Sequence, residues 1–459
     1  MIRKILFVVF FLIALYSANA LLSLLSIKSD IANLKNLSSY ESADQLFPAV
    51  KRIKRNLTVL SPLGPILKKN HEFSSYIELL DTLSEIEPLY KEFFARGTKK
   101  KFLILMQNNA ELRPTGGFWG SYGIIDVEDG RIKNFETTDT FEIDKELVGK
   151  FRAPEEIKDI VEGEWRLWNA NWSPDFKAAS EQAFFFLDQI KEKQNFDGII
   201  APNIDFLLAL LKISGPVQVE GYNFKVSEDN FTLKMIYEPN SYEIFSPSKN
   251  TGSIIKAEEK NIALGKIGRK ALESIIASGK QMELSRQVMN SLANKDIFLF
   301  SKNAESQKIV EKMDWGGRTT KSKNFVMAID ANFGSKLDFI IDKKISVKEI
   351  EQNTYQATIE YKNSYSQKDA SSRQIYTTYR DLLRVYLPDS ALLKEAIGPN
   401  TSATLQKDQE TGLVYASFLL VLEPGESANL SITWTVPPSK ESLSVIKQPG
   451  SKIEIVRAF

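Results

Sequence analysis

The spacing of apolar residues changes near Gly334, and this change constrains the fold more than any other feature of the sequence. Before it, short apolar runs alternate with stretches whose apolar residues recur every three or four positions, which is typical of α/β sheets. After it, the runs alternate or are β-branched, and turns separate them. The sequence therefore predicts an α/β core over residues 99–334 and a separate immunoglobulin-like β-sandwich over residues 335–459.

Within the predicted core, strands and helices follow one another. Lys101–Met106 is predicted as a buried strand, and Asp129-Gly130 as the tight turn of the next hairpin. Trp172–Asp175 predicts a helix start, because Ser173 suits the N-cap and Pro174 the first turn. Phe196–Ala201 and Phe325–Ala331 are predicted as further strands of this core. This alternation predicts a sheet that is covered by helices.

An uncharged stretch, Ile5–Ile27, follows Arg3 and Lys4. At ~1.5 Å per residue it can cross a hydrocarbon core of ~30 Å, with the basic end in the cytoplasm. Residues 1–28 are therefore predicted to be a signal anchor, and residues 29–98 a helical stalk. The alternative is a signal peptide cleaved after Ala18-Asn19-Ala20. Both readings place the body outside the cytoplasm, and the anchor predicts a single-pass cell-membrane protein.

Composition narrows the chemistry. The chain has no cysteine and one histidine, His71, which excludes thiol nucleophiles, disulfides, zinc–thiolate centres and multi-histidine metal sites. Lys and Arg number 59 against 58 Asp and Glu, so no nucleic-acid partner is expected. No haem, flavin, zinc or nucleotide cofactor is expected either. A metal held by oxygen ligands, such as Mg²⁺, remains compatible with this composition.

The densest polar segment, Gln107–Phe118, follows a buried strand at its C-terminal end, where α/β sheets bind ligands. Arg113 offers a planar set of donors for phosphate or carboxylate. Gly116-Gly117 allows backbone N–H groups to approach an anion closely. We therefore predict ligand contacts from this segment; the alternative is a polar turn. The predicted ligand-binding residues in it are Asn109, Thr115, Gly116 and Gly117.

Three further polar groups extend this prediction. Asp139 ends a predicted strand, and Asn171 and Asp175 lie at a helix start. We predict that Asp139 and Asp175 hold Mg²⁺, although either carboxylate can instead cap a helix. Arg269 and Lys270 lie in a predicted helix and can reach a phosphate; the alternative is a solvent-facing basic turn.

Four segments resemble a bacterial family, the domain-of-unknown-function family numbered four thousand and twelve. The segments are Gln107–Phe118, Asn169–Phe176, Phe196–Ile200 with Gly215-Pro216-Val217, and Asp330–Lys336. The resemblance covers roughly residues 99–437, and the first segment is quite specific. It implies an exported, membrane-anchored protein.

More distantly, the chain is similar to the LytR-CpsA-Psr family, which transfers glycan phosphates from polyprenyl pyrophosphate to the cell wall. Arg113 stands where that family has an Arg entering its sheet, and Thr138-Asp139-Thr140 resembles its Arg-Asp-Thr segment without the Arg. Gly268-Arg269-Lys270 resembles part of its Gly-Arg-x-x-Arg-Gln helix. The resemblance implies a LytR-CpsA-Psr-like core with Arg113, Asp139 and Arg269 as catalytic residues.

The resemblance leaves two main functions. The missing arginines favour a binding or structural protein of the cell envelope, which holds a lipid-linked or glycan phosphate. The alternative is a Mg²⁺-dependent glycopolymer phosphotransferase or pyrophosphatase. A solute-binding or sensory ectodomain is a third, weaker interpretation. The expected partners are the membrane and a polyprenyl-linked glycan or cell-wall polymer. The first two functions differ on whether Arg113, Asp139 and Arg269 converge on one cleft.

Overall fold

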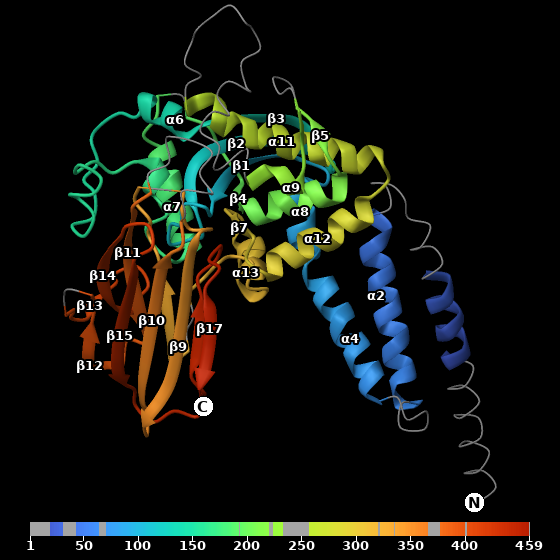
Figure 1. Ribbon diagram of the computed structural model, residues 1–459. Helices are drawn as coiled ribbons and strands as arrows, with labels where there is room; N and C mark the ends of the chain where they lie inside the picture. Colours follow the sequence, from blue (N-terminus) through green and yellow to red (C-terminus); the bar gives the residue numbers. More distant parts are fainter. Residues whose placement is uncertain are drawn as a thin grey trace, which may run out of the picture. The chain divides into compact units, whose positions relative to one another are not determined.

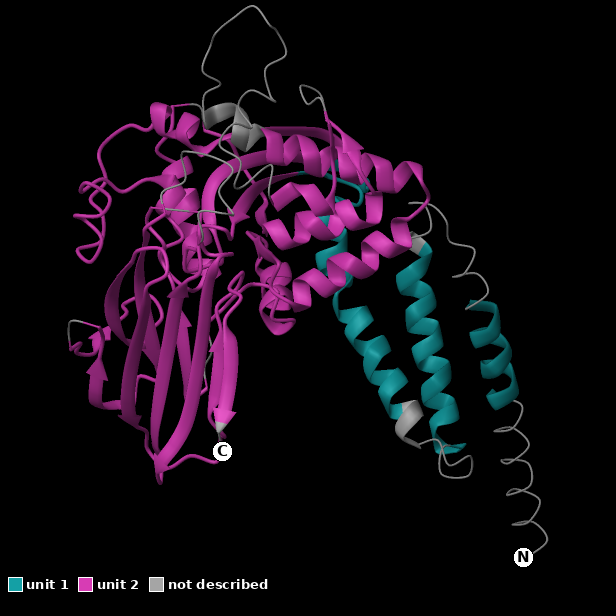
Figure 2. Cartoon of the chain, viewed as in Figure 1, with its two compact units in different colours: residues 1–100, 127–131 teal, residues 101–126, 132–459 magenta. Residues whose placement is uncertain are grey.

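The computed structural model describes residues 19–30, 43–63, 70–191, 193–219, 224–232, 257–319, 322–334, 336–365, 377–399 and 402–458 (Figure 1). The chain divides into two compact units, which Figure 2 colours separately. Unit 1 comprises residues 1–100 and 127–131, and unit 2 comprises residues 101–126 and 132–459. Helices and several sheets are both present, so the predicted mixed α/β class is confirmed.

Unit 1 is helical, as predicted for the N-terminal region. Residues 19–30 are helical, and α2 (Ala43–Leu60), η2 (Ser61–Leu63), α4 (Asn70–Glu85) and α5 (Glu87–Phe93) follow. Ion pairs join these segments, with Arg52 Nη2 2.7 Å from Asp30 Oδ1 and Lys51 Nζ 2.6 Å from Glu87 Oε2.

Most of the predicted membrane anchor lies outside the described residues, since the description begins at residue 19. Within the described ranges, no helix combines the length and apolarity that crossing a bilayer requires.

The first sheet of unit 2 has the strand order β3-β2-β1-β4-β7. β1 and β4 are parallel, with Leu103 opposite Ile199, and β4 and β7 are antiparallel. A two-residue turn at Asp129-Gly130 joins β2 to β3, as predicted, and both residues have positive φ. The strands are β1 (Lys99–Asn108), β2 (Phe118–Glu128), β3 (Arg131–Asp139), β4 (Gly198–Pro202) and β7 (Ile297–Ser301).

Two groups of helices pack with this sheet. On one face, buried side chains of α7 (Phe176–Leu187) and α6 (Thr140–Glu146) share a core with Leu103 and Trp119. A second core is built from α8 (Ile204–Ser214) and α11 (Ala257–Ala277), which Figure 1 shows lying together. The remaining elements are η3 (Leu167–Asn169), β5 (Val217–Gln218), β6 (Lys225–Val226), α9 (Glu228–Phe231), α12 (Gln281–Ala293) and α13 (Ala304–Lys312).

The C-terminal part is rich in strands, as predicted. Two five-stranded sheets, β12-β15-β10-β9-β17 and β13-β14-β11-β8-β16, share one hydrophobic core that includes Trp434 and Phe418. We call this part the two-sheet region. Its strands are β8 (Phe325–Ile329), β9 (Ile341–Glu351), β10 (Thr354–Asn363), β11 (Tyr379–Leu387), β12 (Leu392–Ile397), β13 (Gln406–Lys407), β14 (Val414–Leu422), β15 (Ser427–Thr435), β16 (Ser444–Lys447) and β17 (Glu454–Ala458).

The two-sheet region begins earlier than the expected boundary at residue 335. β8 was expected in the α/β core, but it pairs with β11 and β16 instead. All five residues of β8 are buried, so both of its faces are covered. A continuous apolar run of this kind fits a buried strand of the α/β core or of the two-sheet region. The sequence pattern alone does not say to which of the two the strand belongs.

Candidate functional site

The connection between β1 and β2 carries the polar motif Gln107–Phe118, and its two glycines serve the chain's own packing. A Cβ on Gly117 would lie 2.6 Å from the backbone carbon of Asn108. Gly116 has φ +125° and lies against Pro449 of the two-sheet region. The two glycines were predicted to let backbone N–H groups approach an anion. In the structure they let other segments of the chain approach the backbone closely.

Arg113 is buried, with 5% of its surface exposed, and all three guanidinium nitrogens donate to protein acceptors. Nε donates to Asn169 Oδ1 (3.2 Å), Nη1 to the Leu112 and Asn332 carbonyls, and Nη2 to Glu111 Oε1 (3.2 Å). Its guanidinium carbon also lies 4.6 Å from the centroid of the Phe333 ring. Arg113, the predicted catalytic arginine, therefore bridges the α/β core and the two-sheet region.

The neighbouring predicted ligand residues are also bonded within the protein. Asn109 Oδ1 accepts from the Ile204 N–H, and its Nδ2 donates to Asp205 Oδ2 at 2.7 Å. Asn171 Nδ2 donates to Thr115 Oγ1 (2.9 Å) and to the Gly117 carbonyl (2.8 Å). These hydrogen bonds join the segment Gln107–Phe118 to α8 and to the segment just before α7.

Asp139 and Asp175, the predicted Mg²⁺ ligands, are helix caps. Asp139 is fully buried and accepts from the Phe141 N–H at the start of α6. Asp175 caps α7 and pairs with Arg318 Nε at 3.1 Å. In the part of the chain that the structure describes, no three acidic or histidine side chains gather as a metal site. The capping alternative therefore describes both carboxylates.

The late motif Asp330–Lys336 belongs to a buried charge cluster in the two-sheet region. Lys343 Nζ lies 2.9 Å from Asp330 Oδ2 and 2.5 Å from Asp338 Oδ1. Tyr361 donates to Asp330 and Tyr379 to Asp338. Burial alone would lower the pKa of Lys343, but the surrounding carboxylates raise it above its usual value.

Asp381 is a third, fully buried carboxyl in this cluster. Burial raises its pKa well above the usual value, and the charge of Asp330 raises it further. A raised pKa in the folded state means that Asp381 stabilises the fold below about pH 4 and loses this contribution as the pH rises. We expect Asp381→Asn to match the wild type at pH 4 and to exceed its stability at pH 8. Urea denaturation at both pH values measures this, and an equal difference at both would contradict it.

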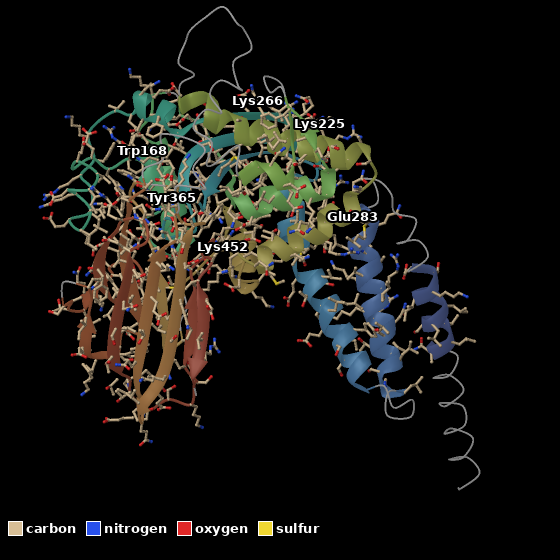
Figure 3. All side chains as sticks on the ribbon, viewed as in Figure 1. Trp168, Lys225, Lys266, Glu283, Tyr365 and Lys452 are labelled. Carbon is tan, nitrogen blue, oxygen red and sulfur yellow. The ribbon has the colours of Figure 1, made fainter. Side chains whose placement is uncertain are left out.

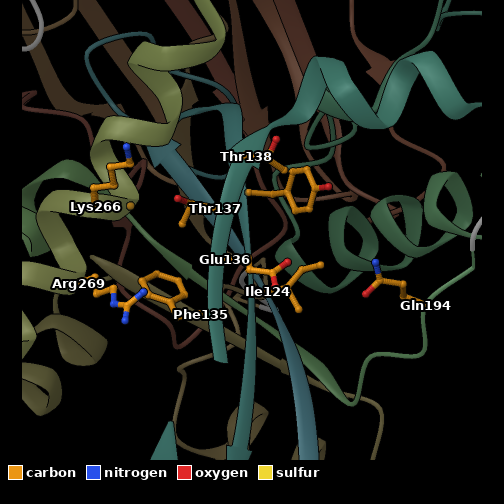
Figure 4. Close-up of a pocket in the computed structure, with 10 residues that line it drawn as sticks. Ile124, Phe135, Glu136, Thr137, Thr138, Gln194, Lys266 and Arg269 are labelled. Carbon is orange, nitrogen blue, oxygen red and sulfur yellow. The ribbon is translucent and has the colours of Figure 1, made fainter. Parts of the chain in front are cut away.

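Arg269, one of the predicted catalytic residues, lines a cavity. The cavity has a volume of about 460 Å³ and lies around β3, next to α11 (Figure 4). Arg269 Nε lies 2.9 Å from Glu273, which also accepts from Lys270, and Lys270 does not line the cavity. The cavity lining does not include Arg113 or Asp139, so the three predicted catalytic residues do not share this cleft.

The cavity lining comes from both faces of β3. Phe135 and Thr137 point toward Lys266 and Arg269 of α11, whereas Glu136 points to the opposite side (Figure 4). Alternation along a strand produces this division. Lys266 is exposed on α11 and is labelled in Figure 3. The lining also includes Tyr122, Ile124, Thr138 and Gln194. No sequence motif pointed to Tyr122 or Gln194.

A smaller cavity of about 60 Å³ adjoins the first and shares Tyr122, Ile124 and Gln194 with it. Its other lining residues are mostly apolar and come from α6, α7 and the segment before β4. They are Ile143, Glu146, Leu187, Ile190 and Phe196. Burial raises the pKa of Tyr122 to about 12, and Glu146, Glu142 and Glu136 raise it in that order. The phenol is therefore a neutral hydrogen-bond donor at neutral pH.

A glycine sets the position of the basic side chains. A Cβ on Gly265 would lie 2.1 Å from Thr137 Cγ2 and 2.6 Å from Thr137 Cβ, so α11 contacts β3 at this point more closely than any other residue type allows. Lys266 follows Gly265 directly, and Arg269 lies about one turn further along the helix. The contact therefore holds both cations beside β3.

Comparisons with known proteins support the family resemblance. Residues 98–238 match the model of a family described as "Protein of unknown function (DUF4012)". This match confirms the resemblance predicted from Gln107–Phe118, over a shorter stretch than expected. Among solved structures, the Lin1025 protein from Listeria innocua matches with a TM-score of 0.25 and 8% identity, over 50% of this chain and 86% of that chain. A score this low carries no argument. None of the curated proteins matches the chain.

Proposed function

We propose that this protein binds a phosphorylated amphiphile, a lipid-linked phosphate or glycan phosphate, in the cavity beside β3. The observation that carries the proposal is the adjacency of two environments. Lys266 and Arg269 line the larger cavity, and five of the eight residues that line the adjoining smaller cavity are apolar. A charged head group and a hydrocarbon tail need such a pair of environments.

The phosphate contacts Lys266 and Arg269 in this proposal. The two residues are three positions apart, so a helix presents them on one side. Among the described residues, no carboxylate forms an ion pair with Lys266, which leaves its ammonium available to an anion. Arg269 pairs with Glu273 through Nε, and 58% of its side chain is exposed. Guanidinium and ammonium groups are the usual protein donors to phosphate.

The tail lies along Ile124 and enters the space between Ile143, Leu187 and Ile190. The methylene groups next to the head group contact these apolar side chains, and the rest of the chain stays in the membrane or at its surface. Burial of each methylene contributes about 0.8 kcal/mol.

A binding role is favoured over transfer because two of the three expected catalytic residues are committed elsewhere. Arg113 donates to protein acceptors, and Asp139 is a buried helix cap. The resemblance to the LytR-CpsA-Psr family supports the ligand class and a related core. The two sheets with a common core support an immunoglobulin-like fold for the C-terminal part.

We also propose that the protein is a single-pass membrane protein whose body lies outside the cytoplasm. Four leucines in the helix of residues 19–30 are more than half exposed. They continue the apolar stretch predicted as the anchor, and a bilayer would cover them. They are Leu21, Leu22, Leu24 and Leu25.

Binding of polyprenyl pyrophosphate tests the proposed function. The full chain in detergent micelles is titrated by calorimetry, with and without Mg²⁺. We expect the double variant Lys266→Met/Arg269→Met to bind at least tenfold more weakly, since both phosphate contacts are lost. Lys308→Met on α13, an exposed lysine outside the cavity lining, is the control for the loss of a surface cation and should bind as the wild type does.

Three outcomes decide between the functions. Absence of binding by the wild type, or equal weakening by the control, contradicts the proposal. Binding without chemical change supports a binding protein. Release of inorganic phosphate during the titration, detected by phosphorus NMR, would instead establish the pyrophosphatase alternative, in which water cleaves the pyrophosphate to polyprenyl phosphate and phosphate.

A further inference from the structure

We propose that the head group of this ligand carries an amine as well as a phosphate. The inference rests on the proposed function and specifies its ligand class. It comes from the charges on the two sides of the cavity. Lys266 and Arg269 lie on the α11 side of β3, whereas Glu136 points to the other side (Figure 4). The chain thus presents a basic wall and an acidic wall to one space.

The acidic wall consists of Glu136 and Glu146. Glu136 lines the larger cavity and Glu146 the smaller one, and Tyr122 lines both. The two carboxylates lie close enough to Tyr122 to raise the pKa of its hydroxyl. Glu136 accepts one hydrogen bond, from Asn134 Nδ2 at 2.9 Å. Among the described residues, no Lys or Arg forms an ion pair with either carboxylate.

The walls do not neutralise each other. No ion pair joins Glu136 to Lys266 or Arg269 in the described structure, because alternation along β3 sends Glu136 to the opposite side. A purely anionic head group would satisfy the basic wall and be repelled by the acidic one. A head group with a phosphate and a primary amine satisfies both, since the ammonium donates charge-assisted hydrogen bonds to the carboxylates.

Two lipids with the same acyl chains and different head groups test this inference. The full chain in nonionic detergent micelles is titrated with dioleoylphosphatidylethanolamine and with dioleoylphosphatidylglycerol. Both are phosphodiesters with the same acyl chains, but the first carries an amine and the second hydroxyl groups. We expect the amine lipid to bind about tenfold more tightly, the effect of one charge-assisted hydrogen bond at a partly exposed site.

Variants of the two carboxylates test whether the acidic wall causes the tighter binding of the amine lipid. Glu136→Gln/Glu146→Gln should bind both lipids with similar affinity, because the amine loses its partners. Glu142→Gln is the control for the loss of an acidic charge near Tyr122: Glu142 pairs with Lys145 and lines neither cavity, so the preference should persist. Equal binding of both lipids by the wild type overturns this inference and leaves the proposed function standing. Binding of neither lipid, nor of polyprenyl pyrophosphate, overturns both.

Discussion

Replacement of Lys343 by methionine is expected to lower the free energy of unfolding by about 3–5 kcal/mol, the cost of removing one partner from a buried ion pair. The Lys343 side chain is 2% exposed, and its ammonium contacts Asp330 and Asp338, whose side chains are 2% and 1% exposed. Methionine fills much of the space that the lysine stem occupied. The loss therefore arises from carboxylates left without a cation in a region of low dielectric constant.

Urea denaturation followed by tryptophan fluorescence measures this effect. All six tryptophans lie in unit 2, so their emission reports the unit that contains the cluster. Lys348→Met, an exposed position on the same strand, should change stability by less than about 0.5 kcal/mol. Addition of Asp330→Asn to Lys343→Met removes one uncompensated charge and should restore part of the loss. A loss below 1 kcal/mol for Lys343→Met would show that the cluster tolerates an unpaired carboxylate.

This cluster also illustrates what sequence pattern predicts and what it does not. Asp330 and Asn332 belong to a family motif, yet the partners of Asp330, Lys343 and Tyr361, are supplied by later strands, and Asn332 donates to Asp338. The strands themselves were predictable because alternation and β-branching depend on local sequence. Which polar side chain meets which other one depends on sheet register, and no local pattern encodes register between distant strands.

The segment Gln107–Phe118 shows the same limit more directly. Its polar composition and its place after a buried strand indicated a ligand site. Composition does not distinguish an arginine that faces solvent from one that faces Asn169 and Asn332, more than fifty residues away. The cavity beside β3 was found only in part, through Arg269. Glu136 and Tyr122 lie in strands of ordinary composition, and their roles follow from the way α6, α7 and α11 surround the strand.

Gly265→Ala should destabilise unit 2 by about 1–3 kcal/mol, although alanine is the better helix former by about 1 kcal/mol. The added Cβ would lie 2.1 Å from Thr137 Cγ2 and 2.6 Å from Thr137 Cβ. Thr137 is β-branched and has few rotamers, so α11 must move away from β3. This movement also carries Lys266 and Arg269 away from the cavity, and we expect weaker binding of polyprenyl pyrophosphate by the folded variant.

Gly268→Ala is the matched control on the same helix. A Cβ there meets only Leu207 Cδ1 at 3.6 Å, an ordinary contact, so the variant should gain about 0.5–1 kcal/mol from helix propensity. Both variants replace glycine by alanine in the same helix, so the gain in helix propensity is the same for each. The difference between their free energies of unfolding, measured under the same conditions, therefore reports the contact with Thr137. Equal stabilisation by both would mean that α11 does not contact β3 at Gly265. In that case Lys266 and Arg269 would have no fixed position beside the strand, and the proposed phosphate site would lose its structural basis.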